Sequence, residues 1–82
     1  MVIMGIQVGN REHDAIKLQE VLTKYGCIIK TRLGVHEATV EGLCASKGLI
    51  ILEFIVGKES EVKALESELH VLESITVRKM EF

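Results

Sequence analysis

The chain has 82 residues, 48% of them hydrophobic, with 10 basic and 12 acidic residues mixed along its length. This composition predicts one domain over residues 1–82, and the balanced charge argues against direct binding to nucleic acid. No run approaches the ~20 apolar residues of a membrane helix, and the N-terminus has no signal-peptide pattern. With only two cysteines, Cys27 and Cys44, we expect a reduced, cytoplasmic protein without a disulfide framework.

The predicted elements follow one another as strand, helix, strand, strand, helix and strand. Residues 2–8 read as a strand, and apolar residues at helical spacing predict a helix over 11–25 that is capped by Gly26. Residues 27–36 alternate as a second strand, and the apolar run 49–56 predicts a third. A second helix is predicted over 59–74 and a fourth strand over 75–82.

The two halves of the chain resemble each other. Val8 and Gly9 end the first strand as Val56 and Gly57 end the third, and the apolar stripes of the two helices also match. A strand–helix–strand unit used twice is the signature of the ferredoxin-like βαββαβ arrangement. We therefore predict an α+β fold, with an antiparallel four-stranded sheet in the order 4-1-3-2 and both helices on one face.

Strand alternation divides the predicted sheet into two faces. The side chains expected to face the helices are Met4, Ile6, Val8, Leu33, Val35, Ile50, Leu52, Phe54, Val56, Ile75 and Val77. The opposite face of the two central strands is expected to carry Ile3, Gly5, Gln7, Leu49, Ile51, Glu53 and Ile55. Its rim would hold Lys30, Arg32 and His36 on one edge, and Thr76, Arg78, Met80 and Phe82 on the other.

An apolar centre with a charged rim is typical of a protein interface. We therefore expect a homo-oligomer, a dimer or a tetramer, whose interface includes Ile3, Gly5, Leu49, Ile51 and Ile55. The plainer alternative is a monomer with a few scattered exposed apolar residues.

The polar residues give little sign of catalysis. The outward positions of strands 1 and 3 are aliphatic, whereas an RNA-recognition module carries aromatic residues there. His13 and His70 are expected to be solvated surface residues, and no nucleophile, base and orienting group occur together. We therefore predict a protein that is not an enzyme and needs no cofactor.

His36 and Cys44 are the two residues with metal-binding chemistry near the middle of the chain. A second subunit would double them, although no spacing typical of a metal site is present. The alternative is a histidine at a strand end and a small apolar cysteine in a loop. The loop over 37–48 is long for a hairpin, so either its strands extend into it or it folds over a neighbouring subunit or ligand.

The segments "IMGIQVGNREHDA", "IKTRLGVHE", "IILEFIVGKESEV" and "LESITVRKMEF" resemble the small ACT-like proteins known as iron-only hydrogenase system regulators. That family is similar in fold to the ligand-sensing C-terminal domain of the nickel-responsive regulator. The resemblance implies a nickel site built from two histidines on strand 2 and a cysteine that opens strand 3. Here His36 matches one histidine, Gly34 and Ile51 occupy the other two positions, and Cys44 lies earlier, in the loop.

ACT domains generally bind small ligands near the turn between strand 1 and helix 1, at a subunit interface. By that resemblance, Gly9, Asn10 and Arg11 are the ligand-binding candidates, and Asn10 and Arg11 would bind a carboxylate. We therefore expect a non-enzymatic regulatory or sensing module that acts as an oligomer with a small ligand or a partner protein. One alternative is a metal-binding sensor that uses His36 and Cys44, and another is a small dimeric α+β enzyme.

Overall fold

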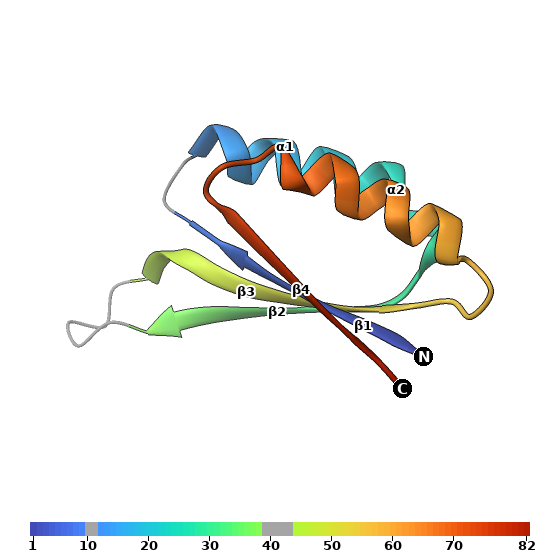
Figure 1. The fold of residues 1–82 in the computed structure, drawn as a ribbon. Coiled ribbons are helices and arrows are strands. Elements are labelled where there is room, and N and C mark those ends of the chain that lie inside the picture. The colour runs from blue at the N-terminus through green and yellow to red at the C-terminus, as the bar shows by residue number, and fades with distance from the viewer. Residues whose placement is uncertain (10–11, 39–43) are drawn as a thin grey trace.

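The computed structural model describes residues 1–9, 12–38 and 44–82, with residues 12, 36–38 and 44–47 described by their backbone alone (Figure 1). Its elements are β1 (Val2–Val8), α1 (Glu12–Lys24), the short 3-10 helix η1 (Gly26–Ile28), β2 (Ile29–Ala38), β3 (Cys44–Phe54), α2 (Glu59–His70) and β4 (Ile75–Glu81). The predicted element order is confirmed, and with it the ferredoxin-like α+β fold.

The four strands form one antiparallel sheet in the order β2-β3-β1-β4, as predicted. Both helices lie on one face of this sheet, and no element of the described chain covers the other face (Figure 1). The chain ends lie side by side, because the Phe82 backbone N–H donates a hydrogen bond of 2.8 Å to the carbonyl of Met1. Among the described residues, neither helix combines the length and the apolar character needed to span a membrane.

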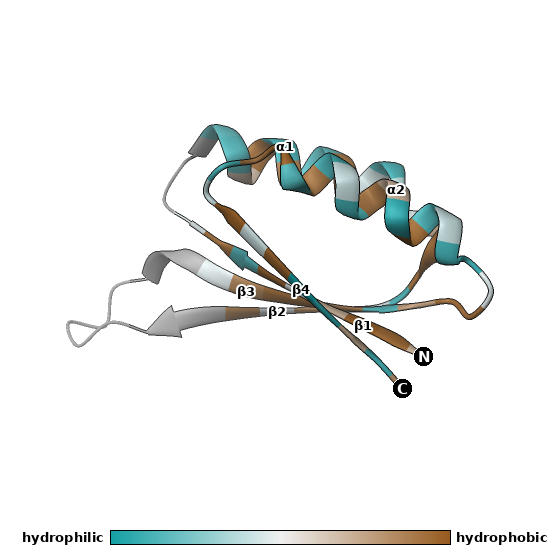
Figure 2. Cartoon of the chain, in the orientation of Figure 1, coloured by the Kyte–Doolittle hydropathy of each residue, from teal (hydrophilic) through white to brown (hydrophobic). Residues whose placement is uncertain are grey.

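Each helix turns one apolar stripe toward the sheet. The stripe residues, all at most 4% exposed, are Leu18, Val21 and Leu22 in α1 and Val62, Leu65 and Leu69 in α2. They pack against Met4, Ile6 and Leu52, which have no exposed surface at all. Figure 2 shows the same division, with apolar residues along the central strands and alternating polar and apolar turns in the helices. The core therefore lies between the helices and one face of the sheet.

A β-bulge near the start of β2 changes which face its side chains occupy. Ile29 pairs with Phe54, yet Thr31 pairs with Glu53, the preceding residue on β3. Lys30 is therefore an extra residue on β2. Since side chains alternate with a period of two, one extra residue moves every later side chain to the other face.

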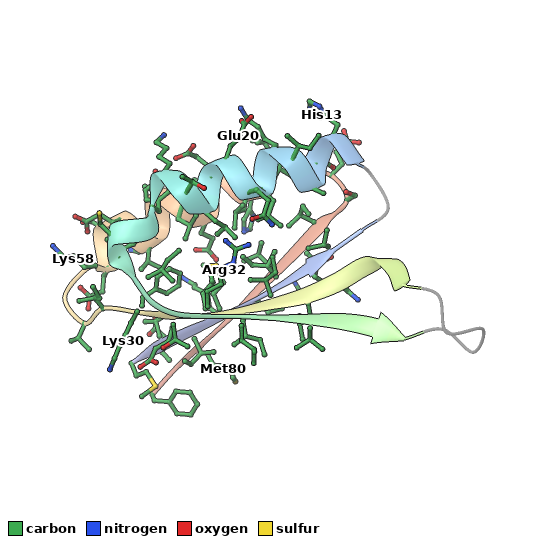
Figure 3. The ribbon with its side chains drawn as sticks, turned by 180° about the vertical axis from the view of Figure 1, so that it is seen from behind. His13, Glu20, Lys30, Arg32, Lys58 and Met80 are labelled. Atoms are coloured by element: carbon green, nitrogen blue, oxygen red, sulfur yellow. The ribbon has the colours of Figure 1, made fainter. Side chains whose placement is uncertain are left out.

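The prediction that Leu33 and Val35 face the helices is therefore wrong. Leu33 lies opposite Ile51 on the uncovered face of the sheet, and the two β2 side chains are 53% and 46% exposed. Arg32, predicted for the rim of that face, lies instead opposite the buried Leu52. Figure 3 shows Arg32 between α1 and the sheet, whereas Lys30 and Met80 extend on the opposite side.

Three element ends also differ from the predictions. β3 ends at Phe54, so Val56 lies in the following turn and is 79% exposed instead of facing the helices. The turn is completed by Gly57, whose φ of 91° suits glycine. Helix α2 ends at His70, and Gly26 begins η1 instead of capping α1.

The long loop predicted over 37–48 is largely strand. β2 continues to Ala38 and β3 begins at Cys44, and these two residues pair with each other. This confirms the first of the two alternatives, a longer hairpin. The tip of the hairpin, 39–43, lies outside the described residues.

Candidate functional site

The uncovered face of the sheet, which we call the open face, carries three rows of side chains. Across β2, β3, β1 and β4 the rows are Thr31–Glu53–Ile3–Met80, Leu33–Ile51–Gly5–Arg78 and Val35–Leu49–Gln7–Thr76. Leu33, Val35 and Leu49 are 40–53% exposed. Together with the half-buried Ile3 and Ile51 they form a continuous apolar centre.

Four of the five predicted interface residues, Ile3, Gly5, Leu49 and Ile51, lie on the open face. The fifth, Ile55, lies just beyond the end of β3 and is 41% exposed. Sequence analysis missed the contribution of β2 to this face, because the bulge at Lys30 is not visible in the hydrophobic pattern.

Gly5 occupies the middle of a central strand, and neither its backbone conformation nor its packing within the chain requires a glycine. A Cβ at Gly5 would meet no atom within 4 Å, and its φ is not positive. Glycine inside a strand is less favourable than alanine by roughly 0.5–1 kcal/mol, and it often marks the close approach of a ligand or another backbone. Gly5 therefore leaves a dent in the open face between Ile51 and Arg78.

Polar groups surround the apolar centre. Glu53 accepts a hydrogen bond of 3.0 Å from the Thr31 hydroxyl and lies 3.7 Å from the Lys30 ammonium. On the other edge, Arg78 donates to the carbonyl of Val77 at 2.9 Å. The charged rim predicted from the sequence is thus present at both edges, although Arg32 does not belong to it.

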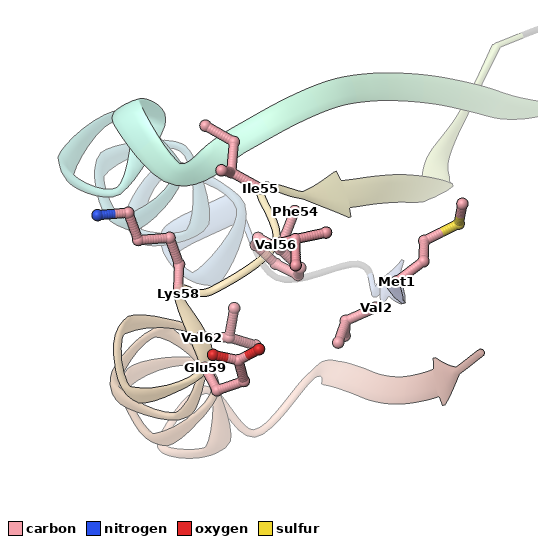
Figure 4. Close-up of a pocket in the computed structure, with 8 residues that line it drawn as sticks. All are labelled: Met1, Val2, Phe54, Ile55, Val56, Lys58, Glu59 and Val62. Carbon is pink, nitrogen blue, oxygen red and sulfur yellow. The ribbon is translucent and has the colours of Figure 1, made fainter.

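A pocket at the start of α2 is too small to be the site of a small-molecule ligand. It lies between the end of β3, the first residues of β1 and α2 (Figure 4). Its volume is about 30 Å³, enough for only one or two water molecules.

The turn between β1 and α1 was the predicted ligand site. Of its three candidates, Asn10 and Arg11 lie outside the described residues. Gly9 has a structural reason of its own, because a Cβ there would lie 2.5 Å from the carbonyl oxygen of Ser74. Close packing against the segment before β4 therefore accounts for this glycine.

Asp14, in the first turns of α1, also contacts the segment before β4. It is 4% exposed and accepts hydrogen bonds from the backbone N–H of Ser74 at 3.1 Å and from its hydroxyl at 2.8 Å. Sequence analysis missed this role. The signal was present, because Asp14 precedes Leu18 by four residues and Val21 by seven, on the apolar stripe of the helix.

The predicted metal candidates both belong to the β2–β3 hairpin. His36 pairs with Gly48, and Cys44 pairs with Ala38, two residues after His36. The backbone thus places both residues near the hairpin end. Among the residues that the structure describes, no group of three or more His, Cys, Asp or Glu side chains is arranged to hold a metal ion.

An electrostatic cluster joins the two helices away from the open face. The Tyr25 hydroxyl donates a short hydrogen bond to the Glu68 carboxylate, and the Lys24 ammonium lies 3.1 Å from the same group. The hydrogen bond from Tyr25 lowers the pKa of Glu68, and the same bond raises the pKa of Tyr25. The cluster connects the end of α1 to α2, which indicates a structural role.

Comparison with known proteins places the fold and goes no further. No protein-family model matches the sequence, and no curated protein matches it. The uncharacterized protein TM1266 from Thermotoga maritima has a similar structure, with a TM-score of 0.75 and 21% sequence identity over 96% of this chain and 91% of that one. The two proteins therefore share a small ferredoxin-like α/β fold over nearly their whole lengths.

A second similar structure belongs to an enzyme. A formyltetrahydrofolate deformylase from Pseudomonas putida KT2440 matches 99% of this chain with a TM-score of 0.56 and 9% identity. The match covers only 28% of that protein. The likeness is one of fold, to a segment of a much longer chain.

Proposed function

We propose that this protein is a non-enzymatic regulatory module that self-associates through its open face and senses a small ligand. The observation that carries the proposal is the continuous apolar centre of that face, which no helix of the described chain covers. Monomeric proteins rarely leave a large apolar patch in water. A second copy of the chain offers the same surface and therefore a matching cover.

The area of the open face is sufficient for such an interface. Its strands have 7 to 11 residues. At ~3.3 Å per residue and ~4.8 Å between strands, the face measures roughly 500 Å². Two copies packed face to face would bury roughly 1,000 Å² in total, which reaches the lower bound for a specific interface.

The layer between the helices and the sheet supports the non-enzymatic part of the proposal. Asp14 is the one buried charged residue in the part of the chain that the structure describes, and it is bonded to Ser74. The other buried side chains are apolar. A catalytic site needs polar groups that converge on a cavity, and the buried side chains of this layer form an apolar core instead.

A link to the regulation of iron-only hydrogenase rests on the sequence resemblance alone. The likeness to TM1266 supports a common fold for the two chains and leaves the regulated system open. The proposed activity is therefore that of a sensing module, and regulation of iron-only hydrogenase is its narrower form.

Light scattering coupled to size exclusion, with native mass spectrometry, tests the self-association. The wild-type chain is expected to be a dimer or tetramer, and Ile51→Lys should give a smaller species because it places a charge in the centre of the face. Ile16→Lys is the matched control, since Ile16 is 56% exposed on α1, away from the open face. A wild-type monomer, or an Ile51→Lys oligomer of unchanged size, would show that the open face is not the interface.

Metal sensing is the second candidate function, and the pairing of Cys44 with Ala38 favours it, because it brings Cys44 near the strand end that holds His36. A site shared between two copies would contain four such groups. Calorimetric titration with nickel or zinc decides between the two proposals. Binding at nanomolar concentration that is lost in both His36→Ala and Cys44→Ser would support the metal sensor, whereas affinity no tighter than about micromolar would contradict it.

A further inference from the structure

A hollow lies on the helix side of the sheet, where the β2–β3 hairpin extends past α1. Its volume is about 250 Å³. It is lined by Val8, Gln19, Arg32, Gly34, Gly48 and Ile50, together with the backbone neighbours Val35 and Leu49. All of these residues are described by the structure, and none belongs to the rows of the open face except the two neighbours.

Gly34 and Gly48 both line the hollow, and Gly34 leaves open space in it. Gly34 pairs with Ile50, and a Cβ at Gly34 would meet no atom within 4 Å. Packing therefore does not require this glycine, and its φ is not positive. A side chain at Gly34 would extend into the hollow, so the glycine keeps the space open. A glycine within a strand often marks a place where a ligand approaches the backbone.

Arg32 supplies a positive charge beside this space. The Arg32 guanidinium donates a hydrogen bond of 2.5 Å to the side-chain oxygen of Gln19 on α1. Gln19 holds the arginine by a neutral group, so the positive charge is not compensated there. A guanidinium has five N–H donors, and most of them stay available beyond the contact with Gln19.

Four of the six lysines whose side chains the structure describes form ion pairs with glutamates, whereas Lys58 and Lys63, like Arg32, do not. The four pairs, at 3.0–3.7 Å, are Lys17 with Glu20, Lys24 with Glu68, Lys30 with Glu53 and Lys79 with Glu66. Among the described residues, Arg32 has no carboxylate within ion-pair distance. Because the oxygen of the Gln19 side-chain amide accepts from Arg32, the NH₂ group of that amide can donate to a second acceptor.

We propose that the hollow binds a small organic anion with a short apolar body. Its carboxylate would accept hydrogen bonds from Arg32 and from the Gln19 amide. Its apolar part would lie over the bare backbone of Gly34, against Val8 and Ile50, which are 9% and 7% exposed. The volume limits the ligand to a few carbon atoms. This inference rests on the proposed sensing role and gives it a ligand class.

Titration of the ¹⁵N-labelled full chain, followed by NMR, tests the proposal with three probes. Butanoate carries both the charge and the apolar body, butanamide has the same shape without the charge, and inorganic phosphate has charge without the body. Butanoate is expected to shift the backbone amides of Gly34 and Gly48 and the side-chain amide of Gln19 in a saturable way. Butanamide and phosphate should bind at least tenfold more weakly.

Two variants and one control locate the binding. Arg32→Gln should weaken butanoate binding at least tenfold, whereas Arg78→Gln, which removes an exposed arginine on the open face, should leave it unchanged. Gly34→Val should abolish binding and leave the melting temperature close to that of the wild type, because its Cβ meets no other atom.

The outcomes separate this inference from the proposed function. Equal binding of phosphate and butanoate, undiminished binding in Arg32→Gln, or the absence of saturable shifts would overturn the organic-anion site. Ile51→Lys changes the opposite face of the sheet, so butanoate should bind it as it binds the wild type. If the wild-type protein is a monomer that binds butanoate, the anion site is supported and the oligomer proposal is wrong. If it is an oligomer that does not bind butanoate, the oligomer proposal is supported and the anion site is wrong.

Discussion

The two faces of the sheet have similar apolar residues and different surroundings. On the helix side, Met4, Ile6 and Leu52 have no exposed surface. On the open face, Leu33, Val35 and Leu49 keep 40–53% of theirs. The difference lies in what covers them, because both helices pack on the same side (Figure 1). The free energy of folding of a single chain therefore comes mainly from one face.

This contrast teaches where each kind of substitution should act. A change on the helix side removes contacts that exist within one chain, and so it should lower stability at any protein concentration. A change on the open face removes few contacts within the chain, and so it should act through association, which depends on concentration. Leu52 and Ile51 are neighbours on β3 that point to opposite faces. Substitutions at these two positions therefore compare the two faces of the sheet within one strand.

The largest effect is expected for Leu52→Ala. Truncating a fully buried leucine typically lowers the free energy of unfolding by about 2–5 kcal/mol, through lost burial and the cavity that remains. Ile51→Ala should cost about 1 kcal/mol or less in dilute protein, because its side chain is only partly buried in the single chain, and the loss should grow as the concentration rises. Urea denaturation at two protein concentrations measures both.

If Leu52→Ala does not fold, Leu52→Val provides a milder truncation at the same position. A concentration-independent loss of several kcal/mol in Ile51→Ala would contradict the division between the faces, because it would place Ile51 in the core of the single chain.

The next largest effect is a difference in stability between alanine substitutions at Gly9 and Gly5. Gly9→Ala forces a Cβ to within 2.5 Å of the Ser74 carbonyl oxygen. Overpacking of this kind costs about 1–3 kcal/mol of unfolding free energy. Gly5→Ala meets no atom, so in dilute protein it should be neutral or stabilising by up to about 1 kcal/mol.

Thermal unfolding measures the two glycine variants side by side, and light scattering reports their size. Since Gly5 lies in a dent of the open face, Gly5→Ala is expected to weaken association while its fold remains intact. Similar destabilisation of the two variants in dilute solution would contradict the structural reason given for Gly9.

Much of this fold could be predicted from hydrophobic periodicity, because period 3.6 and period 2 reflect which residues a helix or a strand can bury. The order 4-1-3-2 followed from the repeated strand–helix–strand unit. What failed was the face of β2. A single bulge at Lys30 reverses the alternation, and the alternating residues Leu33 and Val35 look the same whichever side they occupy.

The candidate site was less predictable, for a related reason. The open face was expected from Ile3, Gly5, Leu49 and Ile51 on two central strands, and the structure places them there. The hollow beside Arg32 depends on the reversed phase of β2 and on a hydrogen bond to Gln19, 13 residues away in the sequence. Contacts of this kind arise from tertiary packing, which local patterns do not contain.

A comparable or smaller effect is expected at Asp14, which joins the start of α1 to the segment before β4. Asp14→Ala removes two hydrogen bonds to Ser74 from a position that is 4% exposed. At roughly 0.5–1.5 kcal/mol for each bond, the free energy of unfolding should fall by about 1–3 kcal/mol. Asp14→Asn keeps an oxygen acceptor and should lose less. Equal loss in both variants, measured by chemical denaturation, would show that the carboxylate charge matters more than its acceptor oxygen.

The smallest effect concerns the helix layer that covers the sheet, and it depends on pH. The hydrogen bond from Tyr25 lowers the pKa of Glu68 below its ordinary value of 4.5, so this contribution to stability is present above pH 4.5 and is lost as the pH falls through the lower pKa of the folded state. The bond to Glu68 raises the pKa of Tyr25 above 10.0. The tyrosine contribution is therefore present below pH 10.0 and is lost as the pH rises through the higher folded value.

Tyr25→Phe tests this dependence of stability on pH. It removes the hydroxyl and leaves the pair between Lys24 and Glu68, so the melting temperature should fall slightly, by a constant amount between pH 5 and pH 9. The difference from the wild type should shrink toward both pH extremes, because there the wild type loses the same hydrogen bond. Lys30→Gln is the control, since its pair with Glu53 lies on the sheet and does not join the helices. If the difference between Tyr25→Phe and the wild type stayed constant down to acid pH, the bond to Glu68 would not be the source of the effect, and the loss would reflect altered packing of the ring.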